Sequence, residues 1–463
     1  MLKPITAMAG LAMLCGTAAT AAPKAPATLA RTEAGQVRGA VEKGVISWKG
    51  IPFAAPPVGD LRWRAPQPAA RWAGVKQTTA YGHDCMQKPF GGDAAPLGTP
   101  PAEDCLYLNV WKPAGAAAGA KGKLPVMVWI YGGGFINGGA SPPTYSGAQM
   151  AGKGVMFVSF NYRVGRFGAF AHPAVTAAAE DGMHTGDFGY LDELAAMKWV
   201  QRNIAGFGGD PANVTVIGES AGGGSVHMLM TSPLSKGLFK RAIIMSGGDG
   251  RMMADVTPAA AAKTAVAFGE SKGVAGDDPD ALRKLRALPA DDVVDGLNLA
   301  QMFGGGIKNY MGPVSDGIVA VPVRAAYEAG QFNQVPVMIG ATSADIGGPT
   351  GPMIAGAREL SDLLSDKGVP VHHYIFSYVA QSLNAPGAGH ASDIPFFFNT
   401  QAVKYGAATT ARDNAMGDAI SSYLANYART GNPNGKGLPA WPAHTRSAPA
   451  RMDFAADAVP QVH

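Results

Sequence analysis

The chain has little charge, few cysteines and no apolar run long enough to anchor it in a membrane. Only 16% of its 463 residues are charged, the net charge is +4, and the basic residues form no cluster, so nothing points to nucleic-acid binding. Three cysteines are present, and we find neither an internal repeat nor a clear domain boundary. What the chain does have is 47% hydrophobic residues, enough to bury a large core.

The N-terminus is typical of a secretory signal peptide spanning residues 1–22. Lys3 precedes an apolar stretch at residues 5–14, and small residues then lead to a cleavage site after Ala21 or Ala22. The apolar stretch is too short to span a bilayer as a permanent anchor. We therefore expect an exported protein, periplasmic or secreted, with no stable membrane anchor.

Cysteine usage agrees with export. Cys15 could mark a lipoprotein, but Leu14 occupies the preceding position, where a small residue would be expected. Cleavage leaves Cys85 and Cys105, and two cysteines in an oxidising compartment most simply form one disulfide. The alternative is two buried thiols. The mature chain, residues 23–463, is expected to form a single domain.

Strand and helix patterns alternate along the mature chain. Continuous apolar runs at residues 126–131 and 155–160 are typical of strands buried on both faces of a mostly parallel sheet. Further strands are expected at 103–111, 214–218, 242–246, 335–340 and 371–378, and helices at 191–203, 357–367 and 412–429, the last ending at Gly431. This alternation predicts a doubly wound α/β domain.

The stretch Gly218-Glu219-Ser220-Ala221-Gly222 follows one of these strands and opens a helical pattern. A sharp turn from strand to helix leaves no room for side chains beside its apex, which explains the flanking glycines. Such a turn exposes Ser220 Oγ and directs the Ala221 N–H beside it, near a helix N-terminus that favours a developing anion. The alternative is an ordinary glycine-rich turn without a catalytic role, which the strand–turn–helix context disfavours.

Three consecutive glycines in Tyr131-Gly132-Gly133-Gly134-Phe135 directly follow another buried strand. Glycines there allow backbone N–H groups to approach a ligand closely. If Ser220 is a nucleophile, this loop supplies the second part of an oxyanion hole. Otherwise it is a flexible loop.

A serine nucleophile requires a general base, and His390 is the best candidate among nine histidines. It lies in a glycine-rich loop at residues 385–393 that follows a strand, where a mobile, solvent-facing base belongs. His372 and His373 lie within a strand pattern, so packing or solvent exposure is their default interpretation. His227, on the helix after Ser220, is expected to be a satisfied, semi-buried side chain.

A serine nucleophile and a histidine base also require an acid that orients the histidine. This acid must lie between Ser220 and His390 in the sequence, close to the end of a strand. Asp345 follows the strand at 335–340 by a few residues, whereas Asp316 has no strong strand before it. We therefore favour Asp345 and keep Asp316 as the alternative.

Together these motifs resemble the type-B carboxylesterase family, which includes cholinesterases and para-nitrobenzyl-esterase-like enzymes, over residues 50–441. The stretches that carry the resemblance are residues 103–109, 131–135, 161–165, 207–211 and 218–223. The resemblance implies an α/β-hydrolase fold, with a mostly parallel central sheet flanked by helices.

For the site, the resemblance implies that Ser220 is the nucleophile, that His390 is the base, and that the oxyanion donors are the N–H groups of Gly133, Gly134 and Ala221. It also implies a disulfide and two ion pairs, namely Cys85–Cys105, Arg62–Glu103 and Arg163–Asp192. Neither a metal nor a cofactor is expected.

The chain departs from the family pattern twice. The family acid is usually Glu in an Asp-Glu-Gly context, but the chain reads Ser343-Ala344-Asp345-Ile346-Gly347, so the backbone must come closer to the base. Only 44 residues, 346 to 389, lie between Asp345 and His390, and helices that usually border the active site have no room at 347–356. We expect a shortened helical region and a more open active site, unless the segment at residues 90–101 or the segment at residues 302–310 covers that site.

These observations predict a serine hydrolase that cleaves small-molecule carboxylic esters through an acyl-enzyme intermediate. An amidase, thioesterase or lactonase would use the same triad. A non-catalytic, cholinesterase-like binding protein would have lost the nucleophile or the base, and this chain keeps both.

Overall fold

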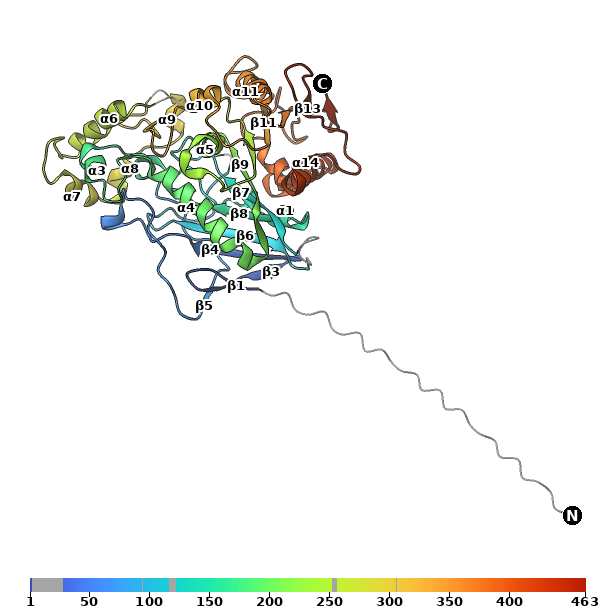
Figure 1. The fold of residues 1–463 in the computed structure, drawn as a ribbon, viewed down its shortest axis with the longest axis horizontal. Coiled ribbons are helices and arrows are strands. Elements are labelled where there is room, and N and C mark those ends of the chain that lie inside the picture. Colours follow the sequence, from blue (N-terminus) through green and yellow to red (C-terminus); the bar gives the residue numbers. More distant parts are fainter. Residues whose placement is uncertain (2–27, 94, 116–121, 252–255, 305) are drawn as a thin grey trace.

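The computed structural model describes residue 1 and residues 28–463, apart from 94, 116–121, 252–255 and 305 (Figure 1). The expected signal peptide at 1–22, with Cys15, and the start of the expected domain at 23–27 thus lie outside the described residues, apart from Met1.

The described part of the chain is built around one large sheet. Its eleven strands are β3 (Ala40–Glu42), β4 (Val45–Pro52), β6 (Tyr107–Pro113), β7 (Leu124–Ile130), β8 (Met156–Phe160), β9 (Gly209–Glu219), β10 (Arg241–Met245), β11 (Val337–Thr342), β12 (Val371–Phe376), β13 (Arg451–Phe454) and β14 (Pro460–Val462). They lie in the order β14-β13-β12-β11-β10-β9-β7-β8-β6-β4-β3. The strands from β8 to β13 in this order run parallel, and antiparallel pairs close both edges. A small separate sheet joins β1 (Leu29–Arg31), β2 (Gln36–Arg38) and β5 (Val75–Gln77).

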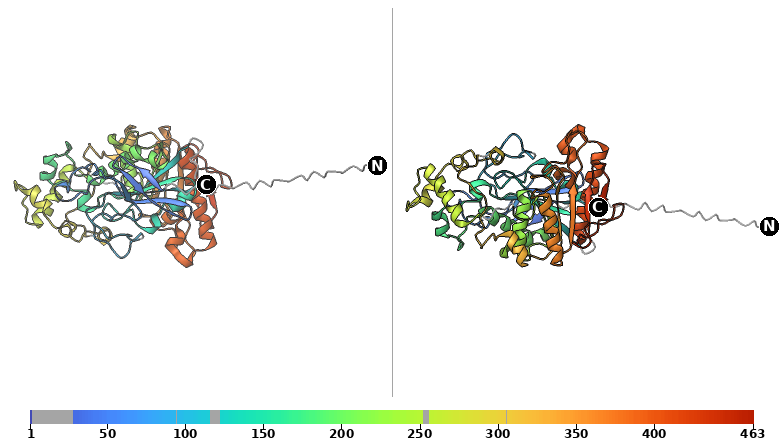
Figure 2. Two further views of the ribbon diagram at one scale, coloured as in Figure 1. Left: turned by 90° about the horizontal axis from the view of Figure 1, so that it is seen from below. Right: turned by 90° about the horizontal axis from the view of Figure 1, so that it is seen from above.

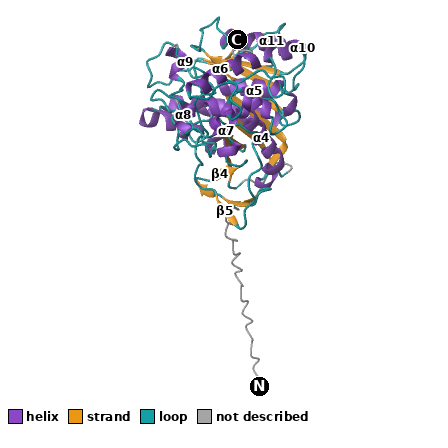
Figure 3. Cartoon of the chain, turned by 90° about the vertical axis from the view of Figure 1, so that its left-hand side faces the viewer, coloured by secondary structure: helices purple, strands orange, loops and turns teal. Residues whose placement is uncertain are grey.

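Helices cover both faces of the large sheet (Figure 2, Figure 3). They are α1 (Ala148–Gly152), α2 (Gly165–Gly168), α3 (Pro173–Ala178), α4 (Phe188–Asn203), α5 (Ala221–Thr231), α6 (Pro258–Ser271), α7 (Ala281–Arg286), α8 (Ala290–Val294), α9 (Ala300–Gly304), α10 (Val323–Ala329), α11 (Ile354–Asp366), α12 (Ile394–Phe397), α13 (Gln401–Tyr405) and α14 (Ala411–Thr430). Figure 1 shows α3, α6, α7 and α8 at the end of the molecule remote from the C-terminus. The prediction of a mostly parallel sheet flanked by helices is confirmed.

One expected strand begins later than predicted. Residues 103–106 precede β6, which starts at Tyr107. The Glu103 carboxylate accepts hydrogen bonds from Arg62, and Cys105 is bonded to Cys85, so this segment is held by side-chain links instead of a strand ladder. The closing helix, in contrast, ends as expected, because Gly431 adopts the left-handed conformation that terminates α14 (φ 84°).

The fold positions the site at one edge of the sheet. Ser220 directly follows β9, Asp345 follows β11 by three residues, and His390 lies in the loop after β12. Since β9, β11 and β12 run parallel, their carboxyl ends lie at the same edge, where open α/β sheets bind ligands.

Candidate active site

Ser220 stands at the apex of a strained turn between β9 and α5. Its backbone has φ 56° and ψ −121°, a conformation that non-glycine residues rarely adopt. A Cβ on Gly218 would collide with the Gly222 carbonyl, and one on Gly222 would collide with the Ile130 carbonyl. The glycines on both sides of Ser220 are therefore needed for the chain to turn this sharply.

Three side chains chosen from the sequence meet at this turn. His390 Nε2 lies 2.8 Å from Ser220 Oγ, and His390 Nδ1 lies 2.6 Å from Asp345 Oδ1. Asp316 lies elsewhere, where its Oδ1 accepts hydrogen bonds from the backbone N–H groups of residues 318–320. The structure thus brings Ser220, His390 and Asp345 together and excludes Asp316 from the cluster.

Asp345 is saturated with hydrogen bonds. Its Oδ2 accepts from Ser246 Oγ at 2.6 Å and from Thr342 Oγ1 at 3.0 Å, and its Oδ1 also accepts from the Ile346 N–H at 2.7 Å. Burial raises the pKa of Asp345, but the hydrogen bonds from His390 and Ser246 outweigh burial and hold that pKa below its ordinary value. Asp345 is therefore ionised at neutral pH.

Direct backbone contact between two loops compensates for the short reach of aspartate. The Ala344 N–H donates to the Ala388 carbonyl at 2.8 Å, and the Ala388 N–H donates to Ser343 Oγ at 3.1 Å. These bonds join the loop of Asp345 to the loop of His390. The backbone thus comes as close to the base as the aspartate requires.

The triple-glycine loop faces Ser220. Gly132 packs directly against Ser220, since a Cβ on Gly132 would lie 2.9 Å from the Ser220 Cβ. Gly133 and Gly134 have φ values of 108° and 65°, which turn the loop back on itself. The N–H groups of Gly133, Gly134 and Ala221 have no acceptor among the described residues, so they are available to an oxygen atom placed beside Ser220 Oγ.

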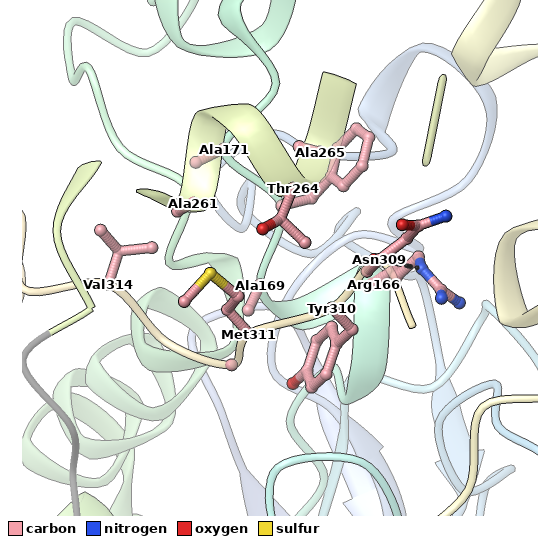
Figure 4. A pocket seen from close by; sticks show the side chains of 12 residues that line it. Arg166, Ala169, Ala171, Ala261, Thr264, Ala265, Asn309, Tyr310, Met311 and Val314 are labelled. Atoms are coloured by element: carbon pink, nitrogen blue, oxygen red, sulfur yellow. Dashed lines mark hydrogen bonds between the residues drawn. The ribbon is translucent and has the colours of Figure 1, made fainter. Parts of the chain in front are cut away.

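Contacts from distant segments brace this loop. The Phe135 carbonyl accepts hydrogen bonds from Tyr310 Oη at 3.0 Å and from the Gly165 N–H at 2.7 Å. The segment that carries Tyr310 is itself held by Arg166, whose guanidinium donates to carbonyls at 293–294 and 308–309. Figure 4 shows Arg166 and Tyr310 beside a cavity of about 20 Å³, which is too small for a substrate.

Two apolar side chains from the segment before and within α9 cover one side of the triple-glycine loop. A Cβ on Gly134 would lie 2.6 Å from Met302 Sδ and 2.8 Å from a Leu299 methyl. The Leu299 N–H donates to Asn137 Oδ1 at 2.7 Å, which fixes this segment to the same loop. The start of the 302–310 segment thus lies beside the triple-glycine loop.

Two further buried carboxyl groups act on His390 electrostatically. Glu219 Oε1 lies 3.4 Å from His390 Nε2, and Glu219 is only 3% exposed. Asp393 is fully buried, at 0% exposure. Neither Glu219 Oε1 nor either carboxylate oxygen of Asp393 has a hydrogen-bond partner among the described residues.

The environment shifts the pKa of each of these groups. Burial raises the pKa of Glu219 to about 7 and raises that of Asp393 well above its ordinary value. Burial lowers the pKa of His390, but the neighbouring carboxylates of Glu219, Asp345 and Asp393 raise it to about 9. Sequence reasoning did not anticipate the roles of Glu219, Asp393 or Ser246, although Glu219 and Asp393 lie within three residues of Ser220 and His390.

The other candidate histidines take no part in this cluster. Burial in β12 lowers the pKa of His372 to about 4 and that of His373 to about 3. His227 is also buried, with its Nδ1 2.9 Å from Tyr327 Oη and its pKa lowered to about 4. All three are buried, neutral packing residues, so His372 and His373 take the first of their two expected roles, and His227 is more deeply buried than expected.

The covalent link and ion pairs implied by the resemblance are present. Cys85 and Cys105 form a disulfide with an S–S distance of 2.05 Å. The ion pairs join Arg62 to Glu103 and, at 2.7 Å between nitrogen and oxygen, Arg163 to Asp192. In the part of the chain that the structure describes, no group of three His, Cys, Asp or Glu residues could hold a metal ion, and every helix is too short or too polar to cross a membrane.

Comparison with known proteins agrees with this geometry. The model of the carboxylesterase family matches residues 26–351 and 350–461, two segments that meet in the loop between Asp345 and α11. Para-nitrobenzyl esterase of Bacillus subtilis (strain 168) is 33% identical over 468 residues, which cover 89% of this chain and 92% of that protein. Fumonisin B1 esterase of Sphingopyxis macrogoltabida is 42% identical over 320 residues, 68% of this chain but only 56% of that protein.

Solved structures are similar as well. A structure of PNB esterase superimposes with a TM-score of 0.81 at 30% identity and covers 94% of this chain and 97% of that chain. A thermophilic PNB esterase gives a TM-score of 0.81 at 29% identity. These likenesses confirm the α/β-hydrolase fold expected from the motifs. The chain therefore belongs to the carboxylesterase family and is a carboxylic ester hydrolase.

Proposed function

We propose that Ser220 is the nucleophile, His390 the general base and Asp345 the orienting acid of a serine esterase. The observation that carries the proposal is the unbroken chain of contacts from Ser220 Oγ through His390 to Asp345, 2.8 Å and 2.6 Å long. A serine hydroxyl needs such a base because it is a weak nucleophile at its own pKa. Asp345, ionised and fixed by Ser246, holds the proton on His390 Nδ1, which leaves Nε2 free to accept one.

The reaction proceeds in two halves. Ser220 Oγ attacks the ester carbonyl carbon while His390 Nε2 takes the hydroxyl proton. The tetrahedral intermediate then expels the alcohol, which receives that proton from His390, and an acyl-serine remains. Water attacks the acyl-serine with the same proton transfers and releases the carboxylic acid.

The N–H groups of Gly133, Gly134 and Ala221 are proposed to stabilise the negatively charged oxygen of the tetrahedral intermediate that forms in each half of the reaction. Since the described residues provide them with no other acceptor, they need no rearrangement when the charge develops. Removing one such donor typically costs about 3 kcal/mol of transition-state stabilisation.

The decisive experiment replaces the nucleophile. Ser220→Ala should leave the melting temperature intact and lower kcat for a para-nitrophenyl ester by roughly 10^4-fold, on the precedent of triad deletions. Ser447→Ala, at an exposed serine, is the matched control and should behave as wild type. Mass spectrometry after treatment with an organophosphonate should place the label on Ser220. A label on another serine would contradict the assignment.

The substrate proposal follows from the short segment after Asp345. Residues 347–352 leave too little chain to build a wall, so we expect an open side that accepts bulky esters. The test compares kcat/KM for a short acyl ester and a bulky aromatic diester, with the corresponding amide and thioester alongside. A strong preference for the short ester contradicts the open site, and faster cleavage of the amide or thioester favours the alternative reaction classes.

We further propose that residues 1–22 direct export and that residues 23–463 form the single mature domain. The disulfide between Cys85 and Cys105 supports this, because such bonds persist in oxidising compartments. N-terminal sequencing of the protein recovered from the periplasm or the medium should begin at residue 22 or 23. An intact N-terminus in the cytoplasmic fraction would contradict export.

A further inference from the structure

A second cavity lies apart from Ser220, between α11 and the sheet. Its volume is about 520 Å³, and its walls come from β11, β12, β13, α11 and the loop that precedes α11. Figure 1 shows α11 close to β11 and β13, on the C-terminal side of the molecule. None of Ser220, His390 and Asp345 lines it. This volume lies within the range of small-molecule sites, about 300–1,000 Å³.

Two arginines of this cavity lack partners. Arg358 projects from α11 and Arg451 from β13, and both line the cavity. Neither guanidinium forms a hydrogen bond or an ion pair with any residue in the described part of the chain, whereas most other arginines there do. The carboxylate in the lining, Glu359, is already paired with Arg251 at 3.0 Å. Both side chains are also exposed, so two positive charges border this cavity without a paired carboxylate among the described residues.

Apart from Glu359, the other residues that line the cavity are neutral and largely apolar. His373 also lines the cavity, and burial, together with the neighbouring His444 and Arg451, lowers its pKa to about 3, so it stays uncharged. Ala341, Ile354 and Ile375 supply apolar surface, and Thr350 adds a hydroxyl at the rim. An inorganic anion would leave this apolar surface without contacts.

We propose that this cavity binds an organic carboxylate whose apolar body packs on the sheet while Arg358 and Arg451 hold its carboxylate. The planar guanidinium pairs with a carboxylate through two parallel hydrogen bonds, a geometry that favours carboxylates and phosphates. The apolar walls select the organic acid over inorganic phosphate. The acid released by the proposed ester hydrolysis belongs to this class, but the site itself is independent of which residue is the nucleophile.

Calorimetric titration of the full chain with phenylacetate tests the proposal. Phenylacetate should bind with a Kd on the order of 1 mM, as its size allows. Phenylacetamide, which has the same apolar body without the charge, should bind at least tenfold more weakly, and so should inorganic phosphate. Phosphate binding equal to that of phenylacetate would overturn the organic part of the proposal, and equal binding of the amide would overturn the role of the arginines.

Variants locate the site. R358Q/R451Q should weaken phenylacetate binding at least tenfold, whereas Arg283→Gln, at an exposed arginine of α7 on the far end of the molecule, should not change it. Unchanged binding by R358Q/R451Q would place the ligand elsewhere, the catalytic pocket included, and overturn the proposal. If that variant fails to fold, R358K/R451K keeps the charge without the planar fork and should bind more weakly than wild type.

A spectroscopic signal separates this site from a general salt effect. His373 lines the cavity, so its ring resonances should shift with saturation as phenylacetate is added. Those of His227, buried beside Tyr327 and outside the lining, should not shift. Shifts of His227 without shifts of His373 would contradict the proposal.

Discussion

The two sides of His390 present carboxyl groups in opposite conditions. On the Nδ1 side, Asp345 receives hydrogen bonds on both oxygens, and its pKa is held below the ordinary value. On the Nε2 side, Glu219 is equally buried but has a carboxylate oxygen without a partner among the described residues, and so does the buried Asp393 of the same loop as His390; burial raises the pKa of both. The same chemical group is thus made a permanent anion in one place and a weak acid in the other.

The difference teaches that hydrogen-bond donors, and not burial, decide the charge of a carboxyl group here. A carboxylate that accepts several hydrogen bonds stays ionised in a buried site, whereas one without donors tends to become neutral. Environments that push the pKa values of neighbouring groups apart are a means of assigning acid and base roles.

The largest effect is expected from Asp345→Asn. The amide keeps the shape but turns the wrong group toward His390 Nδ1, so the imidazole adopts the tautomer that cannot accept the serine proton. We expect kcat to fall by about 10^4-fold, as in triads where this change has been made. Steady-state hydrolysis of a para-nitrophenyl ester measures it.

Asp316→Asn is the matched control, because Asp316 caps a backbone turn and does not contact His390. It should keep wild-type kcat. A damaging Asp316→Asn with a nearly silent Asp345→Asn would show that the wrong carboxylate was assigned.

Glu219→Gln should shift the pH profile. A general base must be unprotonated, so kcat/KM should rise as pH rises through the pKa of His390, which its carboxylate neighbours raise to about 9. Glu219, with a pKa of about 7, contributes to this as it ionises. Removing its charge lowers the pKa of His390, so the acid limb of the profile should move to lower pH.

The profile of the wild type provides the reference for this shift. Its acid limb should lie above 6.5, the ordinary pKa of histidine. A limb that stays in place in Glu219→Gln would mean that Glu219 carries no charge when the enzyme acts, and melting curves of both proteins exclude a loss of folding.

Ser246→Ala should have a smaller effect. It removes one of the donors to Asp345 Oδ2, at 2.6 Å, while Thr342 still donates to the same oxygen. A hydrogen bond to a charged group is worth about 1.5–3 kcal/mol. Since Thr342 remains, we expect a loss of about tenfold in kcat/KM, measured by steady-state hydrolysis of the same para-nitrophenyl ester.

How far the sequence predicts this site depends on whether a residue is marked by its neighbours along the chain. Ser220 stands in a turn whose glycines are required by the close carbonyls of Gly222 and Ile130, and His390 and Asp345 follow strand ends. These local patterns located the cluster. The segment at 103–106 was expected to be strand but is not. Its conformation depends on contacts with Arg62 and Cys85, which lie far away in the sequence.

The supporting residues were beyond reach for the same reason. Arg166 acts on carbonyls more than 120 positions further along the chain, and Ser246 donates to a carboxylate 99 positions away. No local sequence pattern identifies such pairs, because the neighbours of an arginine or serine along the chain do not show which distant group it will contact. The unpartnered oxygens of Glu219 and Asp393 likewise become visible only when the packing around them is known.

Asp393→Asn is expected to change kcat/KM least, and it tests whether Asp393 is neutral where Asp345 is charged. Asp393 is fully buried without a hydrogen-bond partner in the described chain, and burial raises its pKa well above the ordinary value, so it should be protonated and neutral at neutral pH. An amide of the same shape, also neutral, should then keep kcat/KM within about threefold, in line with the small cost of replacing one neutral polar group by another. The acid limb of the pH profile should also stay in place.

If Asp393 is instead ionised, it contributes to the raised pKa of His390, and Asp393→Asn should move that limb to lower pH as Glu219→Gln does. Comparing the two variants at the same ionic strength decides which of the two buried carboxyl groups carries the charge that His390 senses.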